Sequence, residues 1–220
     1  MELEVFYDYR CPFVYQAALL IRRVRESGER DLEVGWRYFS LSQANNHEEG
    51  WTIWDAAPDD PAAKGRLAFQ AAEAARRQER FEPFHQALLE ARHEHRRDID
   101  DPHVVEEVAA QAGLDLARFR RDLASPALLE ALARDHQEAV NRLGVFGTPT
   151  FHVPGRGAAY VRIRPAPEGP AALDLFDQVI DVVAEKPYLL ELKRPRPDRP
   201  PGEVRPAVEA AAATSSASGR

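Results

Sequence analysis

Cysteine and long apolar runs are scarce in this 220-residue chain, and each scarcity excludes a class of protein. Cys11 is the only cysteine, so no disulfide can form within the chain. The longest apolar stretches are about five residues, such as 17–21, whereas a helix that crosses a bilayer needs roughly 20. The N-terminus also lacks the basic and apolar regions of a signal peptide. We therefore expect a cytoplasmic protein with no membrane partner.

Positive charge is in deficit as well. The chain has 29 Lys and Arg residues against 36 Asp and Glu residues, which gives a net charge of −7. Nucleic-acid binders neutralise phosphates with Lys and Arg, so we expect no nucleic-acid partner. A hydrophobic content of 44% and a charged content of 30% are instead typical of a soluble globular chain that buries a core.

The pattern of apolar residues predicts an α/β fold. Two strand-like segments, 3–7 and 32–39, flank a helix that Pro12 begins and Gly28 ends, and this βαβ unit implies parallel strands. The pattern predicts three further elements later in the chain: strands at 150–153 and 159–163, and an amphipathic helix at 173–184. The order β-α-β, helical middle, β-β-α is that of a thioredoxin-like core interrupted before its second half.

The middle of the chain, from about residue 61 to 144, is predicted to be helical. Three helix starts share one signal, an oxygen-bearing side chain followed by proline: Asp60-Pro61, Asp101-Pro102 and Ser125-Pro126. We assign 46–144 to an all-helical insertion. The segments 1–45 and 145–190 then form the α/β domain, and the Pro-, Ala- and Ser-rich residues 191–220 form a tail that we expect to be disordered.

Cys11 lies where the first strand gives way to the first helix, and Pro12 follows it at a position that suits the first helical turn. A thiol at this place meets unpaired backbone N–H groups and the positive end of the helix dipole. Both favour the thiolate, which is the reactive form of cysteine. The alternative is that Cys11 is a small apolar residue that closes a turn.

Two motifs together resemble the DsbA family. The segment 7–15, YDYRCPFVY, resembles the family's active-site motif, which is usually C-P-x-C followed by an aromatic residue. The segment 145–151, VFGTPTF, resembles the family's cis-proline loop, which implies that Pro149 is cis. The likeness covers roughly residues 2–186 and implies a thioredoxin-like β-α-β…β-β-α core with an all-helical insertion. More narrowly, it points to the branch of FrnE-type oxidoreductases, kappa-class glutathione transferases and 2-hydroxychromene-2-carboxylate isomerases.

Val14 departs from the family pattern, because it occupies the position of the second, resolving cysteine. With no second thiol, Cys11 would act as a monothiol: its thiolate attacks a disulfide sulfur, and an external thiol resolves the mixed disulfide. We expect no tightly bound cofactor. The expected co-substrate is glutathione or another low-molecular-weight thiol, such as mycothiol or bacillithiol. The expected partner is a small-molecule thiol or disulfide, or a protein disulfide.

The resemblance also implies which residues surround the thiol. Pro12, Phe13 and Val14 would lie on the helix side, and Thr148 and Pro149 on the other. A cis bond at Pro149 would expose the Thr148 backbone, which could pair with an incoming peptide or thiol as an added strand does. The alternatives are an ordinary turn around Pro149 and a core position for Val14.

His93 and Asn46 are less specific candidates. His93 resembles a histidine that faces the thiol from the helical insertion in some bacterial relatives, where it would protonate a leaving thiolate. Alternatively, His93 is a solvated member of a polar run. Asn46 matches a polar position in the thiol-cofactor groove of relatives, although a turn signal explains it as well. We expect no metal site, because His93 and His95 point to different faces of a helix.

The sequence thus predicts a DsbA-family thiol–disulfide oxidoreductase that works as a monothiol through Cys11. Two alternatives keep the same fold. One is a glutathione-dependent isomerase or transferase, in which Cys11 activates glutathione and is never oxidised. The other is a non-catalytic thioredoxin-like binding protein.

Overall fold

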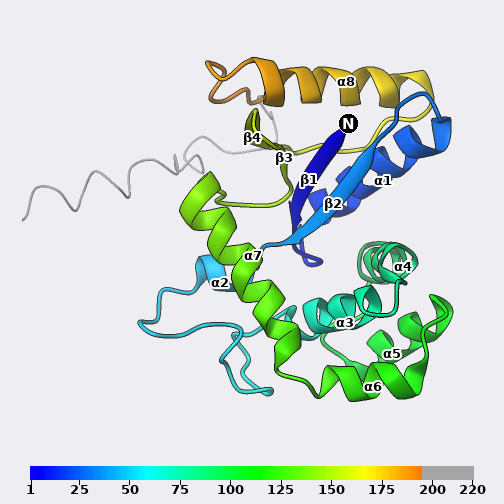
Figure 1. The fold of residues 1–220 in the computed structure, drawn as a ribbon, viewed down its shortest axis with the longest axis vertical. Helices are drawn as coiled ribbons and strands as arrows, with labels where there is room; N and C mark the ends of the chain where they lie inside the picture. The colour runs from blue at the N-terminus through cyan, green and yellow to red at the C-terminus, as the bar shows by residue number, and fades with distance from the viewer. Residues whose placement is uncertain (195–220) are drawn as a thin grey trace, which may run out of the picture. The chain divides into compact units, whose positions relative to one another are not determined.

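The computed structural model describes residues 1–194, so the predicted tail at 191–220 lies mostly outside the described residues. Residues 1–187 form one compact unit that contains a single sheet. The strands are β1 (Glu2–Tyr7), β2 (Glu33–Tyr38), β3 (Thr150–Val153) and β4 (Gly157–Tyr160), in the order β2-β1-β3-β4 (Figure 1). β1 pairs with β2 in parallel, and β3 pairs with β1 and β4 in antiparallel. The predicted parallel βαβ unit and the later hairpin are therefore confirmed, but the span 159–163 predicted for the last strand is wrong: this strand begins at Gly157, directly after a tighter turn, and ends at Tyr160.

The helices of the described residues follow the predicted order except for the short α2, which was not predicted. They are α1 (Pro12–Ser27), α2 (Leu41–Asn45), α3 (Arg66–Arg76), α4 (Phe81–His93), α5 (Pro102–Gln111), α6 (Leu116–Leu123), α7 (Ala127–Leu143) and α8 (Pro170–Glu185). None of these helices has both the length and the hydropathy that crossing a membrane requires. The mixed α/β, thioredoxin-like fold class is thus confirmed, whereas the division of the chain at residues 45 and 145 stays a prediction.

The two faces of the sheet are covered by different helices. Leu3, Val5 and Tyr7 of β1 are buried in the main core, together with the apolar sides of α1 and α8. Phe6, which is one residue out of phase, packs with Ala139 of α7 on the opposite face. Side chains along a strand alternate between its faces, so the continuous apolar run of β1 serves both.

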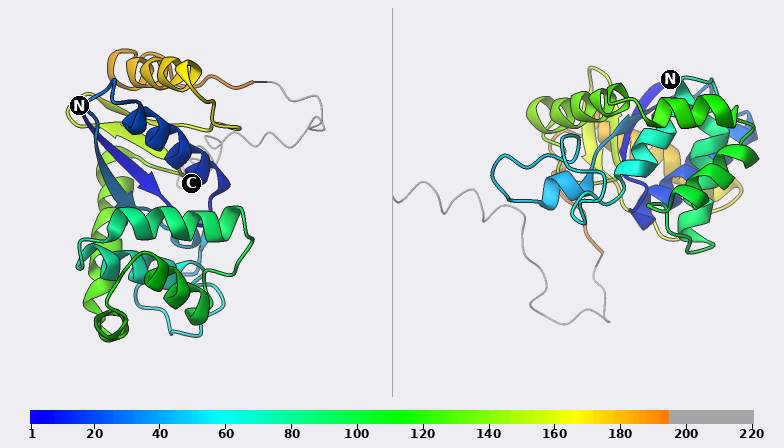
Figure 2. Two further views of the ribbon diagram at one scale, coloured as in Figure 1. Left: turned by 90° about the vertical axis from the view of Figure 1, so that its right-hand side faces the viewer. Right: turned by 90° about the horizontal axis from the view of Figure 1, so that it is seen from below.

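Helices α3 to α6 gather beyond the end of the sheet at which β1 and β2 finish, and α7 leads from them back to β3 (Figures 1 and 2). The loop that follows β1 therefore faces the helical insertion. This is the loop that carries Cys11, so the thiol lies where the insertion meets the sheet.

The predicted helix start at Asp60-Pro61 is wrong. The Asp60 carboxylate accepts hydrogen bonds from the Ala62 N–H and from Trp51 Nε1, both at 2.8 Å, and closes a turn. The helix α3 begins only at Arg66, after Gly65 in a left-handed conformation with φ of 83°. An Asx turn, which Asp favours as strongly as a helix cap, took the place of the first helical turn.

The other two predicted starts lie close to helices. α5 begins at Pro102, and the Asp101 side chain accepts the His103 N–H at 2.9 Å, so this start is confirmed in full. α7 begins at Ala127, and no side chain caps it, although the Ser125 carbonyl accepts the Leu128 N–H at 3.3 Å. At that end the proline places the helix, and the serine hydroxyl does not contribute.

Candidate active site

Cys11 occupies the N-cap of α1, and Pro12 is the first helical residue. The Cys11 N–H donates to the Asp8 carbonyl at 3.0 Å, and the Val14 N–H donates to the Cys11 carbonyl at 3.1 Å. Only 6% of Cys11 is exposed. The first-turn amides of a helix have no acceptor within the helix, so the thiol lies beside donors that suit a negatively charged sulfur.

The thiol meets the loop before β3, 137 positions along the chain. Cys11 Sγ lies 3.2 Å from the carbonyl oxygen of Thr148, to which the thiol donates. The peptide bond between Thr148 and Pro149 is cis, as the resemblance implies. Two bonds fix this loop: the Pro149 carbonyl accepts the Val161 N–H at 2.9 Å, and the Gly147 carbonyl accepts the Thr150 hydroxyl at 2.8 Å. The structure thus brings Cys11, Thr148 and Pro149 together.

Asp8 holds the turn that presents the thiol, and sequence reasoning did not single it out. Its side chain is fully buried, and its two oxygens accept the Arg10 N–H at 2.8 Å and the Leu41 N–H at 2.7 Å. Burial raises the pKa of Asp8 to about 6, although these two N–H donors favour the charged form. Asp8 therefore ties the Cys11 turn to the start of α2. An acidic residue between a buried strand and a motif cysteine was the available signal.

Aromatic side chains lie near the thiol. Phe146 is 66% exposed and packs on Tyr160, with ring centroids 5.2 Å apart. Burial raises the pKa of Tyr160, and the negative charge that Cys11 can carry adds to this effect. The Arg162 guanidinium lies 4.0 Å from the centroid of the Phe13 ring. These residues thus offer apolar faces and a cation to a molecule that approaches the thiol.

His93 reaches the Cys11 turn from α4. Its Nε2 lies 2.8 Å from the carbonyl oxygen of Tyr9, and its ring stacks on Tyr15 with centroids 5.6 Å apart. A carbonyl can only accept, so Nε2 carries a hydrogen in this arrangement. Burial lowers the pKa of His93, which favours the neutral ring. The geometry gives His93 a role in positioning the turn, and its predicted role as proton donor stays a prediction.

The remaining candidates differ in their surroundings. Pro12 is exposed, whereas Val14 lies on the buried side of α1 in the main hydrophobic core. Asn46 follows the last residue of α2, and its side chain accepts the Glu48 N–H at 2.8 Å. That bond is local, as the turn interpretation expects, so a part for Asn46 in thiol binding stays a prediction. Within residues 1–194, no cluster of three or more His, Cys, Asp or Glu side chains is arranged to hold a metal ion.

Comparisons with known proteins bear on the fold and the family. The family model for the DSBA-like thioredoxin domain matches residues 2–166. The uncharacterized protein Rv2286c of Mycobacterium tuberculosis is 26% identical over 201 residues, which are 88% of this chain and 82% of that protein.

Two solved structures are similar in fold. One is a probable DsbA oxidoreductase, SCO1869 from Streptomyces coelicolor, with a TM-score of 0.58 and 20% identity over 90% of this chain and 97% of that chain. The other is a 2-hydroxychromene-2-carboxylate isomerase, with a TM-score of 0.58 and 15% identity over 82% of this chain and 94% of that chain. At these identities the likeness shows the fold alone.

Proposed function

Because the chain belongs to the DSBA-like thioredoxin domain family, we propose that it is a thiol–disulfide oxidoreductase that works as a monothiol through Cys11. One observation carries the proposal: the chain's single thiol lies at a helix N-cap, 3.2 Å from the carbonyl before a cis-proline. Val14 fills the neighbouring helical position with a buried apolar side chain. The chain therefore has no second thiol that could attack a mixed disulfide on Cys11.

The proposed cycle has two exchange steps. In the first, the Cys11 thiolate attacks one sulfur of a disulfide, the S–S bond breaks, and the departing thiolate leaves with the electron pair and takes a proton from solvent. In the second, the thiolate of glutathione or a similar small thiol attacks the mixed disulfide and releases Cys11. The small thiol leaves joined to the retained half of the substrate, and a second small thiol releases that half, so the substrate disulfide is reduced and two small thiols are oxidised to their disulfide. A cytoplasmic location would supply that thiol in its reduced form.

The loop before β3 supports substrate binding beside the thiol. Among the described residues, no acceptor is found for the Thr148 N–H, whereas the Thr148 carbonyl pairs with Cys11 Sγ. An extended peptide or the backbone of a thiol tripeptide could accept that N–H as an edge strand does. The exposed ring of Phe146 would then contact the apolar part of the substrate.

A quenched turnover experiment tests the proposal. The protein turns over a small disulfide, such as hydroxyethyl disulfide, with reduced glutathione, and the reaction is stopped with acid before mass analysis of Cys11. We expect turnover, and a measurable fraction of Cys11 in a mixed disulfide. Cys11→Ser, which keeps a hydrogen-bond donor of similar shape, should be inactive. If Cys11 stays fully reduced while the disulfide is consumed, the proposal fails.

A glutathione-dependent isomerase or transferase is the second candidate. Cys11 donates to the Thr148 carbonyl, which shows that the side chain can act as a hydrogen-bonding group at this place without being oxidised. In such an enzyme Cys11 would hold the sulfur of glutathione and remain a thiol throughout the quenched reaction. A protein that neither turns over nor forms an adduct would instead support the non-catalytic binding protein.

A further inference from the structure

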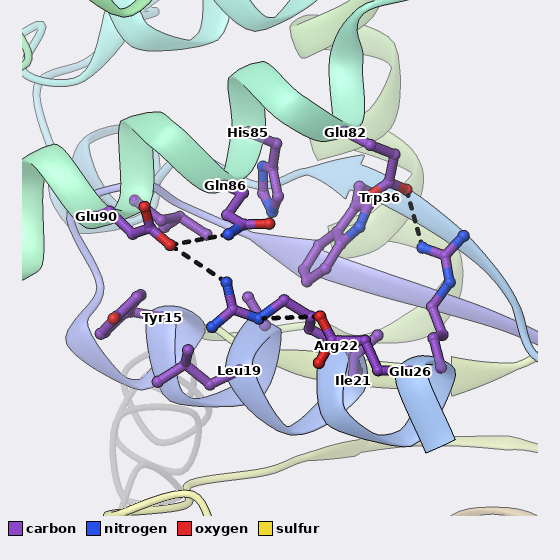
Figure 3. Close-up of a pocket in the computed structure, with 13 residues that line it drawn as sticks. Tyr15, Leu19, Ile21, Arg22, Glu26, Trp36, Glu82, His85, Gln86 and Glu90 are labelled. Carbon is purple, nitrogen blue, oxygen red and sulfur yellow. Dashed lines mark hydrogen bonds and ion pairs between the residues drawn. The ribbon is translucent and has the colours of Figure 1, made fainter. Parts of the chain in front are cut away.

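A cavity lies between α1 and α4, and Cys11 is not among the residues that line it (Figure 3). Its volume is about 260 Å³, and its apolar lining includes Ala18, Leu19, Ile21 and Leu89. An apolar protein cavity of roughly 150 Å³ holds one benzene molecule, and drug-sized ligands occupy roughly 300 Å³ or more. The α1–α4 cavity therefore suits a molecule of one or two rings.

Two buried nitrogen atoms belong to side chains that line the cavity. In Figure 3, His85 points from α4 toward α1, and the Trp36 indole lies beside it. Their ring centroids are 4.3 Å apart, and only 2% of His85 and 5% of Trp36 are exposed. Within the described residues, neither His85 Nε2 nor Trp36 Nε1 has a hydrogen-bond partner. Buried polar groups in proteins are rarely left unpaired, and a ligand atom could supply the partner that these two nitrogens lack.

The chemistry of the two nitrogens selects a hydrogen-bond acceptor. Trp36 Nε1 can only donate. His85 Nδ1 lies 3.0 Å from the Tyr9 hydroxyl, and when that hydroxyl donates, the neutral ring carries its hydrogen on Nε2. Burial lowers the pKa of His85 to about 3, so the ring is neutral at physiological pH. One ligand oxygen could therefore accept from two adjacent donors.

The rim of the cavity argues against a charged ligand. Each cationic side chain on the rim already faces a carboxylate. Arg22 Nη1 lies 3.2 Å from Glu90 Oε1, and Arg22 Nε lies 3.9 Å from Glu26 Oε1. Arg25 Nη1 lies 3.3 Å from Glu82 Oε1. The Gln86 amide also donates to Glu90, at 2.9 Å (Figure 3). A charged ligand would have to break these pairs, whereas an uncharged one leaves them intact.

We propose that the α1–α4 cavity binds a small, uncharged aromatic carbonyl compound of one or two rings, whose oxygen accepts from Trp36 and His85. The ring lies on the apolar lining between the two helices. Neither nitrogen is in contact with solvent, so side chains of the lining must shift for the ligand oxygen to reach them. This site is separate from the thiol site and does not depend on the chemistry of Cys11.

A pair of matched probes tests the proposal on the intact protein. The two-ring ketone 1-indanone has the carbonyl, and indane has the same rings without it. The indole N–H signals of the ¹⁵N-labelled protein are followed during titration with each compound. We expect 1-indanone to shift the Trp36 signal saturably, with a Kd of about 1 mM or below, and indane to bind at least about threefold more weakly. The signals of Trp51 and Trp54, outside the cavity, are internal controls.

Two variants test whether 1-indanone binds in the α1–α4 cavity. Ala18→Leu adds bulk to the cavity lining and should abolish the shift, and Trp36→Phe keeps a ring but removes the donor and should weaken binding about threefold or more, as seen by ligand-detected NMR. The proposal is overturned if 1-indanone causes no saturable shift, if indane binds as tightly, or if Ala18→Leu binds unchanged. The two probes on the wild-type protein decide the matter even if a variant fails to fold.

Discussion

Helix α1 contributes to two sites that are built in opposite ways. At its N-terminus, the groups that hold the Cys11 turn are paired: both oxygens of Asp8 accept backbone N–H groups, and the thiol donates to Thr148. Along its α4-facing side, the cavity is lined by Trp36 and His85, whose nitrogens have no partner within the described residues.

The paired groups of the thiol turn and the unpaired groups of the cavity suit different functions. A reactive group needs a fixed position, so the thiol turn is held by several short hydrogen bonds. A binding cavity instead gains from groups that stay unpaired until a ligand arrives, because the ligand then supplies the missing partner. Substitutions that remove a hydrogen bond should therefore reduce the reactivity of the thiol site. The cavity should instead respond to an added ligand or to added side-chain bulk.

The largest effect is expected from Cys11→Ser. The hydroxyl can still donate to Thr148, so the fold should persist, but disulfide exchange requires sulfur. Turnover of a small disulfide with glutathione should fall to the uncatalysed rate, while the thermal unfolding midpoint changes little. Activity that survives this substitution would show that the chemistry resides elsewhere.

Val14→Cys should convert the monothiol into a dithiol site. Val14 stands where the motif resemblance places the family's resolving cysteine, and it is fully buried on α1. After exposure to oxidised glutathione, this variant should form an internal disulfide and retain little glutathione, as measured by intact mass under non-reducing conditions. Val14→Ser, which opens a similar space without a thiol, is the matched control and should keep the adduct. A stable adduct on Val14→Cys would contradict the inferred placement.

Asp8→Asn should slow the alkylation of Cys11 by iodoacetamide about tenfold, because the amide group cannot accept the second backbone N–H. Asp100→Asn is the control: Asp100 accepts the Gly65 N–H at 2.7 Å and is one of the charges that act on Asp8, but it does not bond the thiol turn. Equal alkylation rates for Asp8→Asn and the wild type would show that Asp8 does not position the thiol.

Asp8→Asn should also change how the free energy of unfolding depends on pH. Burial raises the pKa of Asp8 from 3.8 to about 6, so the folded protein binds this proton more tightly than the unfolded chain does. The contribution of Asp8 to the free energy of unfolding therefore rises as pH falls from about 7 to about 3, by about 3 kcal/mol. Denaturant unfolding across this range should show the difference between wild type and Asp8→Asn growing in favour of the wild type. A constant difference would contradict the raised pKa.

His93→Gln should have the smallest effect, about threefold or less on turnover at neutral pH. Glutamine can still donate to the Tyr9 carbonyl, and burial already keeps the histidine ring neutral. If His93 is instead the proton donor, its loss should cost roughly 100-fold or more. The turnover rate of this variant between pH 6 and pH 8 separates the two roles.

Local signals in the sequence predicted some parts of this structure and failed at others for a physical reason. Asp101-Pro102 and Asp60-Pro61 carry the same signal, and both carboxylates accept the N–H two residues on, yet only the first begins a helix; the difference is that the Asp60 carboxylate also accepts from Trp51 Nε1. The fate of such a signal depends on a residue nine positions away. That contact has no counterpart in the local pattern.

The thiol site was predictable only through the pairing of two motifs. Composition and periodicity give no reason for Cys11 and Thr148, 137 positions apart, to meet, whereas the family resemblance does. Arg162 near Phe13 belongs to no motif and appears only in the folded chain. The α1–α4 cavity depends in the same way on the packing of Trp36 against His85, far apart in the sequence.

The most direct test of the central claim is the intact mass of the wild-type protein after incubation with oxidised glutathione. The account predicts one glutathione adduct per chain, on Cys11, which an excess of small thiol removes completely. A protein that remains unmodified under these conditions, while Cys11 is shown to be reduced and the fold intact, would contradict it.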